Sequence, residues 1–125
     1  MVAIDTNIAI AYLKHELILP NGVDVEDFLL PVTVVGELLF GAANSGRPAE
    51  NLRAYRSFIR DLRALSLDAL AAEHYAEIRL ALKQKGRPIP ENDMWIAAIC
   101  RAHDVPLLTF DKHFGEITGL ALLTL

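Results

Sequence analysis

The chain of 125 residues lacks several features that would place it in a specialised class of protein. It has no apolar run near the roughly 18 to 20 residues that a membrane-spanning helix needs. Its first residues show no basic stretch followed by an apolar one, so we expect no signal peptide. Its single cysteine, Cys100, cannot form an internal disulfide and fits a reducing cytoplasm. We expect Cys100 to be a small buried side chain.

An excess of positive charge and a zinc-binding pattern are missing as well. The chain has 12 Lys and Arg against 16 Asp and Glu, so its formal net charge is −4. This balance argues against a nucleic-acid binder that relies on overall positive charge, although a bound metal ion and a local basic patch could still meet phosphates. None of the histidines forms an HxxxH pair or has a cysteine at zinc-ligand spacing, so we expect no zinc site.

The chain does contain a regular alternation of short apolar runs and helical patterns, with no linker that divides it, and we expect one domain over 1–125. Strands are predicted at 2–4, 27–32, 64–67, 105–110 and 120–125. Helices are predicted at 6–14, 33–44, 48–62, 69–84 and 93–103, with a short helical turn after 110. Short apolar strands separated by helices predict an α/β fold in which helices cover both faces of a parallel sheet.

Four carboxylates stand where their neighbours in the sequence are apolar. Asp5 and Asp111 each follow a predicted strand directly, Asp93 opens a predicted helix, and Glu37 lies in the middle of an apolar helix. An ionised carboxylate in apolar surroundings is costly unless it is paired, hydrogen-bonded or bound to a metal. Glu37 has no Lys or Arg three or four residues away, so it has no partner on its own helix.

These four acids are expected to meet in space. The carboxyl ends of parallel strands share one edge of a sheet, so Asp5 and Asp111 should emerge together where the winding of the sheet reverses. Glu37 and Asp93 can face the same crevice. Each pair of carboxylates about 4 Å apart costs on the order of 4 kcal/mol at an effective dielectric constant near 20. A hard divalent cation such as Mg²⁺ or Mn²⁺ removes this cost, so the sequence predicts a metal site.

Other interpretations of the acids stay open. Asp5, Asp111 or the neighbouring Asn7 could cap helices, and Asp93 could be a first-turn acid that suits the helix dipole. Asp68 lies between a predicted strand and a helix, which favours a plain N-cap. Asp68 could instead be the phosphoacceptor of a receiver-like signalling domain that binds Mg²⁺, although the last strand lacks the lysine that such a domain needs.

The order of the motifs resembles a known family. Four segments, "AIDTNI", "VVGELLFGA", "IPENDMWIAAIC" and "LLTFDKHFGEI", are similar to the four motifs of PIN-domain ribonucleases. The likeness is strongest to the VapC toxins of bacterial and archaeal toxin–antitoxin pairs, and it runs from Asp5 to Phe114. The resemblance implies a three-layer α/β/α fold, Mg²⁺- or Mn²⁺-dependent endonucleolytic cleavage of RNA, homodimerisation and neutralisation by a VapB-type antitoxin.

By motif, the four acids of the family correspond to Asp5, Glu37, Asp93 and Asp111, and its accompanying polar positions to Asn7 and Thr109. A metal held by these acids would bind a phosphate oxygen and lower the pKa of a coordinated water, and one of the acids could accept the water's proton. A catalytically idle member of the fold that only binds its partner is an alternative, against which the intact acids argue.

A stripe of arginines forms a second candidate site. Arg53, Arg56, Arg60 and Arg63 recur at spacings of three and four residues, so they are expected to share one face of a helix. They could guide the RNA backbone, or they could be the solvated face of a helix whose other side is apolar.

Overall fold

Five short strands form one parallel sheet in the computed structural model, which describes all of residues 1–125. The strands are β1 (Val2–Ile4), β2 (Phe28–Pro31), β3 (Arg63–Leu65), β4 (Leu107–Thr109) and β5 (Leu122–Thr124). Their order across the sheet is β3-β2-β1-β4-β5, and every neighbouring pair is parallel. The winding therefore reverses between β1 and β4, as the sequence predicted.

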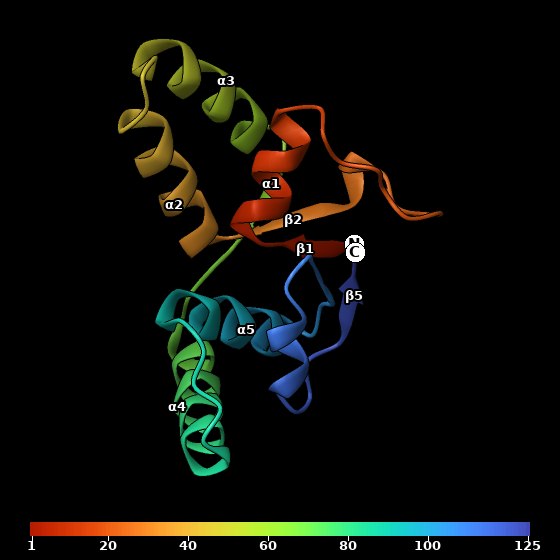
Figure 1. The fold of residues 1–125 in the computed structure, drawn as a ribbon, viewed down its shortest axis with the longest axis vertical. Helices are drawn as coiled ribbons and strands as arrows, with labels where there is room; N and C mark the ends of the chain where they lie inside the picture. Colours follow the sequence, from red (N-terminus) through yellow and green to blue (C-terminus); the bar gives the residue numbers. More distant parts are fainter.

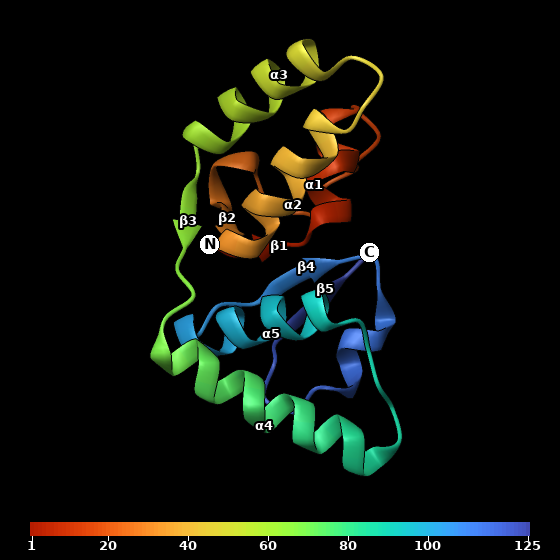
Figure 2. The ribbon, with the colours of Figure 1, turned by 90° about the vertical axis from the view of Figure 1, so that its left-hand side faces the viewer.

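Helices cover both faces of this sheet, which gives the expected three-layer α/β/α arrangement (Figures 1 and 2). On one side lie α1 (Thr6–Leu13), α2 (Val32–Ala43) and α3 (Pro48–Arg60). On the other side lie α4 (Ala69–Lys85) and α5 (Glu91–His103). Two short 3-10 helices complete the fold, at Val25–Asp27 and Lys112–Glu116. No helix combines the length and the apolar composition that crossing a membrane requires.

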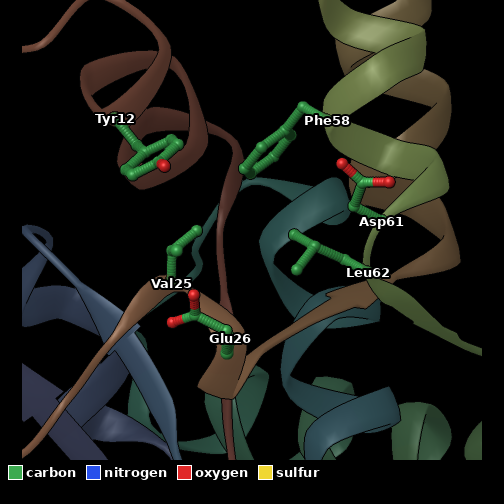
Figure 3. A pocket seen from close by; sticks show the side chains of 6 residues that line it. All are labelled: Tyr12, Val25, Glu26, Phe58, Asp61 and Leu62. Atoms are coloured by element: carbon green, nitrogen blue, oxygen red, sulfur yellow. The ribbon is translucent and has the colours of Figure 1, made fainter.

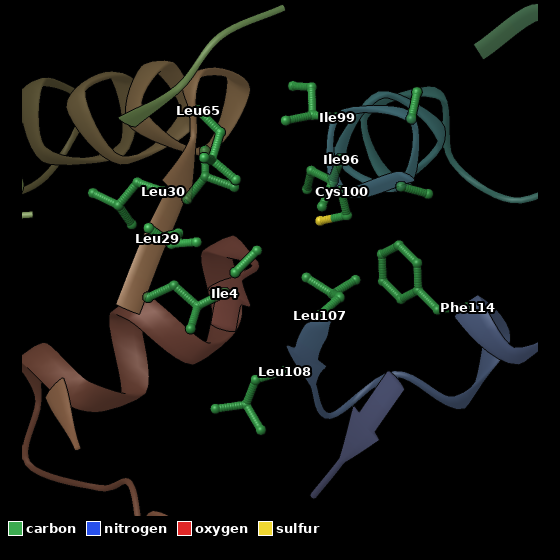
Figure 4. Close-up of a cluster of buried hydrophobic side chains, with 14 of the residues drawn as sticks. Ile4, Leu29, Leu30, Leu65, Ile96, Ile99, Cys100, Leu107, Leu108 and Phe114 are labelled. Atoms are coloured by element: carbon green, nitrogen blue, oxygen red, sulfur yellow. The ribbon is translucent and has the colours of Figure 1, made fainter. Parts of the chain in front are cut away.

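The hydrophobic core lies around the three middle strands, since every residue of β1, β2 and β4 is buried. Figure 4 shows Ile96 and Cys100 of α5 above Leu107 of β4, with Phe114 of the second 3-10 helix beside them. Cys100 is fully buried, as expected, and this burial raises the pKa of its thiol to about 12. The edge strands differ, because β3 and β5 leave most of their residues exposed or only half-buried.

The region between α3 and β3 differs from the prediction. The helix ends at Arg60 rather than at residue 62, and the strand covers 63–65 rather than 64–67. Arg63 therefore begins an edge strand and does not continue the helical stripe, so that part of the prediction is wrong. The physical reason is strand pairing, because β2 offers partners for Arg63 to Leu65 only, and its last residue, Pro31, pairs with Leu65.

The start of α5 and the length of β4 also differ. The helix begins at Glu91, directly after Pro90, whose carbonyl oxygen accepts the N–H groups of Asp93 and Met94 at 3.0 and 3.2 Å. Asp93 therefore lies inside the first turn and does not open the helix. The strand β4 keeps only residues 107–109 of the predicted 105–110.

The helix α4 begins and ends as the sequence indicated. Asp68 is its N-cap, since a side-chain oxygen of Asp68 accepts the backbone N–H of Ala71 at 3.0 Å. At the other end, Gly86 adopts a φ of +67°, a left-handed conformation in which glycine has no steric penalty. Asp68 thus has a structural role, as the N-cap interpretation predicted.

We expect Asp68→Ala to lower the free energy of unfolding by about 1 kcal/mol, because it removes the cap of the longest helix. Asp68→Asn keeps a capping oxygen and should stay close to wild type. Urea unfolding of the three proteins, followed by circular dichroism, measures the difference. Equal stability of the alanine and asparagine variants would show that the cap contributes nothing.

Candidate metal centre

Asp5 lies at the end of β1 and is almost completely buried, with 6% of its surface exposed. One carboxylate oxygen accepts the N–H of Ile8 at 3.0 Å and thereby caps α1, a position that the sequence also allowed for Asn7. The other oxygen accepts the hydroxyl proton of Thr109 at 2.5 Å. Burial raises the pKa of Asp5, and these two hydrogen bonds lower it in part. The carboxylate is therefore held at both oxygens.

Thr109 connects the two central strands at their carboxyl ends. It is the last residue of β4 and is fully buried. Its hydroxyl donates to Asp5, and the same oxygen accepts the N–H of Asp111 at 3.0 Å. Asp111 in turn accepts the N–H of His113 at 2.8 Å and so caps the second 3-10 helix. Both capping interpretations of the sequence are correct, and the caps bring Asp5 and Asp111 to the same edge of the sheet.

Glu37 is half-buried on α2, and its Oε1 atom is buried without any hydrogen-bond partner. The hydroxyl oxygen of Thr33, one turn earlier on the same helix, is also buried and unpartnered. Buried polar atoms in folded proteins are normally hydrogen-bonded, so such exceptions require an explanation. An ion or a ligand that these oxygens meet would supply one.

Asp93 is half-buried in the first turn of α5, and its carboxylate accepts no hydrogen bond from the protein. The pKa of Asp93 is raised to about 6. Burial is the largest cause, the negative charges of Asp111, Asp5 and Glu37 follow in that order, and His113 opposes them. All three of the other acids thus lie close enough to act on Asp93, which brings the four predicted carboxylates into one region.

The donor set of this region suits a hard divalent cation, because all four side chains offer carboxylate oxygens. As they stand, no three acidic, histidine or cysteine side chains are close enough together to hold an ion between them. A magnesium-type ion is usually bound by one or two carboxylates together with water and substrate phosphates. The unpartnered oxygen of Glu37 and the raised pKa of Asp93 are consistent with such an ion.

The remaining predicted residues lie outside this cluster. Asn7 is exposed in the first turn of α1; its side chain hydrogen-bonds to none of the acids, and only its backbone N–H acts on Asp5, whose pKa it lowers. Arg53, Arg56 and Arg60 are exposed on α3, and Arg63 is exposed on β3. None of these arginines forms an ion pair with a carboxylate.

A hollow of about 200 Å³ between α1 and α3 is separate from the acids (Figure 3). Tyr12 and Phe58 stack in its wall with their ring centres 5.4 Å apart, and Glu26 and Asp61 lie at its rim. Tyr12 lies seven residues after Asp5, which corresponds to about 10 Å along the axis of α1. This hollow therefore contributes nothing to the carboxylate cluster.

Two residues of the cluster were missed in the sequence. His113 was not singled out from the sequence; it is exposed, yet its ring Nδ1 lies 2.8 Å from an oxygen of Asp111. The spacing of two residues within a turn after a strand is the signal that could have indicated this contact. Thr33 lies one turn before Glu37, and this i, i+4 spacing was visible in the sequence.

Comparisons with known proteins agree on one family. The model of the PIN domain family matches residues 2–120. "Ribonuclease VapC5" of Mycobacterium tuberculosis is 31% identical over 110 residues, which cover 81% of each chain. "tRNA(fMet)-specific endonuclease VapC" of Shigella flexneri is 33% identical over 126 residues, which cover 94% of this chain and 92% of that protein.

Solved structures with the same fold include toxin–antitoxin complexes. The DNA-bound VapBC of Salmonella typhimurium superposes with a TM-score of 0.88 and 27% identity, over 99% of this chain and 98% of the other. VapBC2 of Rickettsia felis, bound to a DNA fragment from its promoter, gives a TM-score of 0.87 with 26% identity over the same shares of the two chains.

We expect the metal-free protein to lose stability as the pH rises from about 4 to about 6. The pKa of Asp93 is about 6 in the folded state against an ordinary value of 3.8, so the folded protein keeps a proton that the unfolded chain has released in this range. The stabilisation is present below the ordinary value and is lost above the folded one. Asp93→Asn should therefore be more stable than wild type at pH 7 in EDTA, with the difference vanishing below about pH 4.

Urea unfolding at several pH values measures this effect, with Glu73→Gln, an exposed position on α4, as a control for the loss of one charge. A difference between Asp93→Asn and wild type that is the same at every pH would contradict the expectation.

Proposed function

This chain belongs to the PIN-domain family, and from that membership we propose that it is a VapC-type toxin whose acids support hydrolysis of RNA phosphodiester bonds. The observation that carries the proposal is the gathering of Asp5, Glu37, Asp93 and Asp111 around the β1–β4 boundary, where each of the other three raises the pKa of Asp93. Relatives named ribonuclease or endonuclease support the same activity. The receiver-like alternative has no support, because Asp68 caps α4 and the family is another one.

The proposed metal ligands are these same four acids, with Mg²⁺ or Mn²⁺ as the ion. A bound ion would supply Lewis acidity toward a phosphate oxygen and lower the pKa of a water. The residues around it prepare the donors, because Thr109 orients the carboxylate of Asp5 and positions the backbone of Asp111. Asn7, exposed two residues beyond Asp5, is proposed as a supporting residue of the site.

The arginines of α3 support the proposal that the substrate is RNA. Arg53, Arg56 and Arg60 line a shallow groove of about 540 Å³ along the helix, and no carboxylate neutralises them. Arg63 follows on β3. In a chain of net charge −4, this local excess of positive charge suits a phosphate backbone.

We also propose a VapB-type antitoxin as a partner, together with a second copy of the chain in a homodimer. The superposed structures are complexes of VapBC toxin–antitoxin systems. Large apolar side chains that remain exposed in the single chain, such as Phe40 on α2 at 70% and Ile18 at 88%, support a protein partner.

Asp5→Asn should abolish metal-dependent RNA cleavage, with a loss of at least about 100-fold. Replacing residues that only support a metal ligand costs about 10- to 100-fold in metal affinity or activity, so a ligand should cost no less. Asparagine caps a helix as well as aspartate does, so the fold should persist. Cleavage of RNA with Mn²⁺ measures the effect, and excess EDTA should abolish the wild-type activity. Asp68→Asn, with the same change of charge, is the control that should stay active.

Full activity of Asp5→Asn, or undiminished wild-type cleavage in excess EDTA, would overturn the proposed role of the acids. Absence of cleavage by the wild type on every RNA offered with Mn²⁺ would favour the idle, partner-binding member of the fold.

Replacing Arg53 and Arg56 together by Ala should weaken RNA binding and flatten its dependence on salt. Each lost phosphate contact should reduce the slope of log affinity against log salt by about 0.7 on a single strand, or by about 1.4 for two. Fluorescence anisotropy of a labelled RNA in EDTA measures the slope, and Lys14→Ala removes an exposed cation elsewhere as a control. An unchanged slope would favour a merely solvated face.

A further inference from the structure

A groove of about 350 Å³ runs between the last turns of α4 and the segment that leads into α5. Arg79, Leu82 and Lys83 of α4 form one wall, and Pro88 and Met94 form the other. The groove thus combines an apolar lining with two cationic groups. None of the four proposed metal ligands lines it, and of the lining residues only Met94 belongs to a family motif, "IPENDMWIAAIC".

The groove lies at the start of α5, on the side of the molecule toward which the strands run. Met94 follows Asp93 directly in the first turn of α5. Figure 2 shows that α5 begins on the same side of the molecule on which β5 ends, and β5 runs parallel to β4. This is the side to which the carboxyl ends of all five strands point, and it is where Asp5 and Asp111 emerge. A strand of RNA with a phosphate at the acids can therefore continue along this side of the molecule toward the groove.

The two cations differ in how they are held. The guanidinium of Arg79 donates to the hydroxyl of Tyr75 at 2.7 Å and lies 3.7 Å from a carboxylate oxygen of Glu91. The ring of Tyr75 stacks on Trp95 with centres 3.7 Å apart, so Arg79 is fixed between the two helices. The ammonium of Lys83, in contrast, has no hydrogen bond and no ion pair and is exposed. Lys83 is thus free to meet an anion.

We propose that this groove binds the nucleotide next to the scissile phosphate of the RNA substrate. The phosphate of that nucleotide lies at Lys83 and Arg79. Its sugar and base lie against the exposed Pro88, while Leu82 and Met94, 2% and 8% exposed, form the buried floor of the groove. The volume is at the lower end of the range of about 300–1,000 Å³ for small-ligand sites, which suits one nucleotide. This assignment rests on the proposed nuclease function and names a subsite of the same site.

Charge favours RNA over a protein partner in this groove. An acidic peptide could also approach the cations, but the uncompensated carboxylates beside Asp93 would repel it just as they repel one another. RNA is drawn to the same place by the ion that the acids are proposed to hold. The groove could also contact a second copy of the chain, and an experiment must distinguish this contact from RNA binding.

The decisive variant is Lys83→Gln, tested on a labelled single-stranded RNA of 12 nucleotides in EDTA, where binding is read without cleavage. We expect about a five- to tenfold loss of affinity at low salt and a salt slope that is shallower by about 0.7. Lys83→Arg keeps the charge and should bind like wild type. Lys14→Gln, which removes an exposed cation at the far end of α1, should also leave the slope unchanged.

Kinetics with Mn²⁺ give a second reading. Loss of a contact made equally in the bound substrate and in the transition state raises KM and leaves kcat nearly unchanged. We expect this pattern for Lys83→Gln. In the wild type, an abasic site moved along the RNA should raise KM most when it stands beside the cleaved bond.

Three outcomes would overturn the proposal while the wild type still cleaves RNA: an unchanged salt slope for Lys83→Gln, a loss in kcat alone, or an altered oligomeric state with unchanged RNA binding. The last, seen by size-exclusion chromatography, would assign the groove to a contact between copies. Failure of the wild type to cleave any RNA would instead overturn the proposed nuclease function. The assignment of the groove as a subsite, which rests on that function, would then also be wrong.

Discussion

The hydrogen bond from Thr109 to Asp5 joins two residues that are 104 positions apart in the chain. It closes the boundary between β1 and β4, the two strands at which the winding of the sheet reverses. Without this donor, Asp5 would be a buried carboxylate with one oxygen unsatisfied, which costs about 1–3 kcal/mol or more for a charged group. The position of Asp111 depends on the same residue, because the Thr109 oxygen also accepts the backbone N–H of Asp111.

Around this bond the protein tolerates an electrostatic conflict. Burial and like charges raise the pKa values of Asp5 and Asp93, so the folded state without an ion is penalised whenever these groups are ionised. The apolar core of β1, β2, β4 and α5 offsets this penalty. The clustered carboxylates thus destabilise the protein without a bound ion, and a cation that neutralises them removes the penalty. A metal-dependent site requires this combination.

The sequence predicted the parallel sheet, its covering helices and the reversal between the first and fourth strands, because apolar runs of strand length alternate with helical patterns. It also singled out the four acids, because each interrupts an apolar stretch. It could not place Arg63, whose assignment to a strand depends on how far β2 extends beside it. Nor could it find the contact of His113 with Asp111 or the fixed position of Arg79, because both follow from how turns and helices pack in space. The charges that act on Asp93 support the roles that we propose for the acids as metal ligands.

The central position of β1 in the sheet bears on how the molecule is made. Synthesis delivers β1 first and β4 only after more than a hundred further residues, and the two are direct neighbours at the site. A nascent chain on the ribosome therefore carries Asp5 without Thr109 or Asp111 until both of these residues have been synthesised. Under the proposed assignment of the acids, a product that terminates before Asp111 lacks part of the site, since the fold joins its first and last motifs only after both have been made.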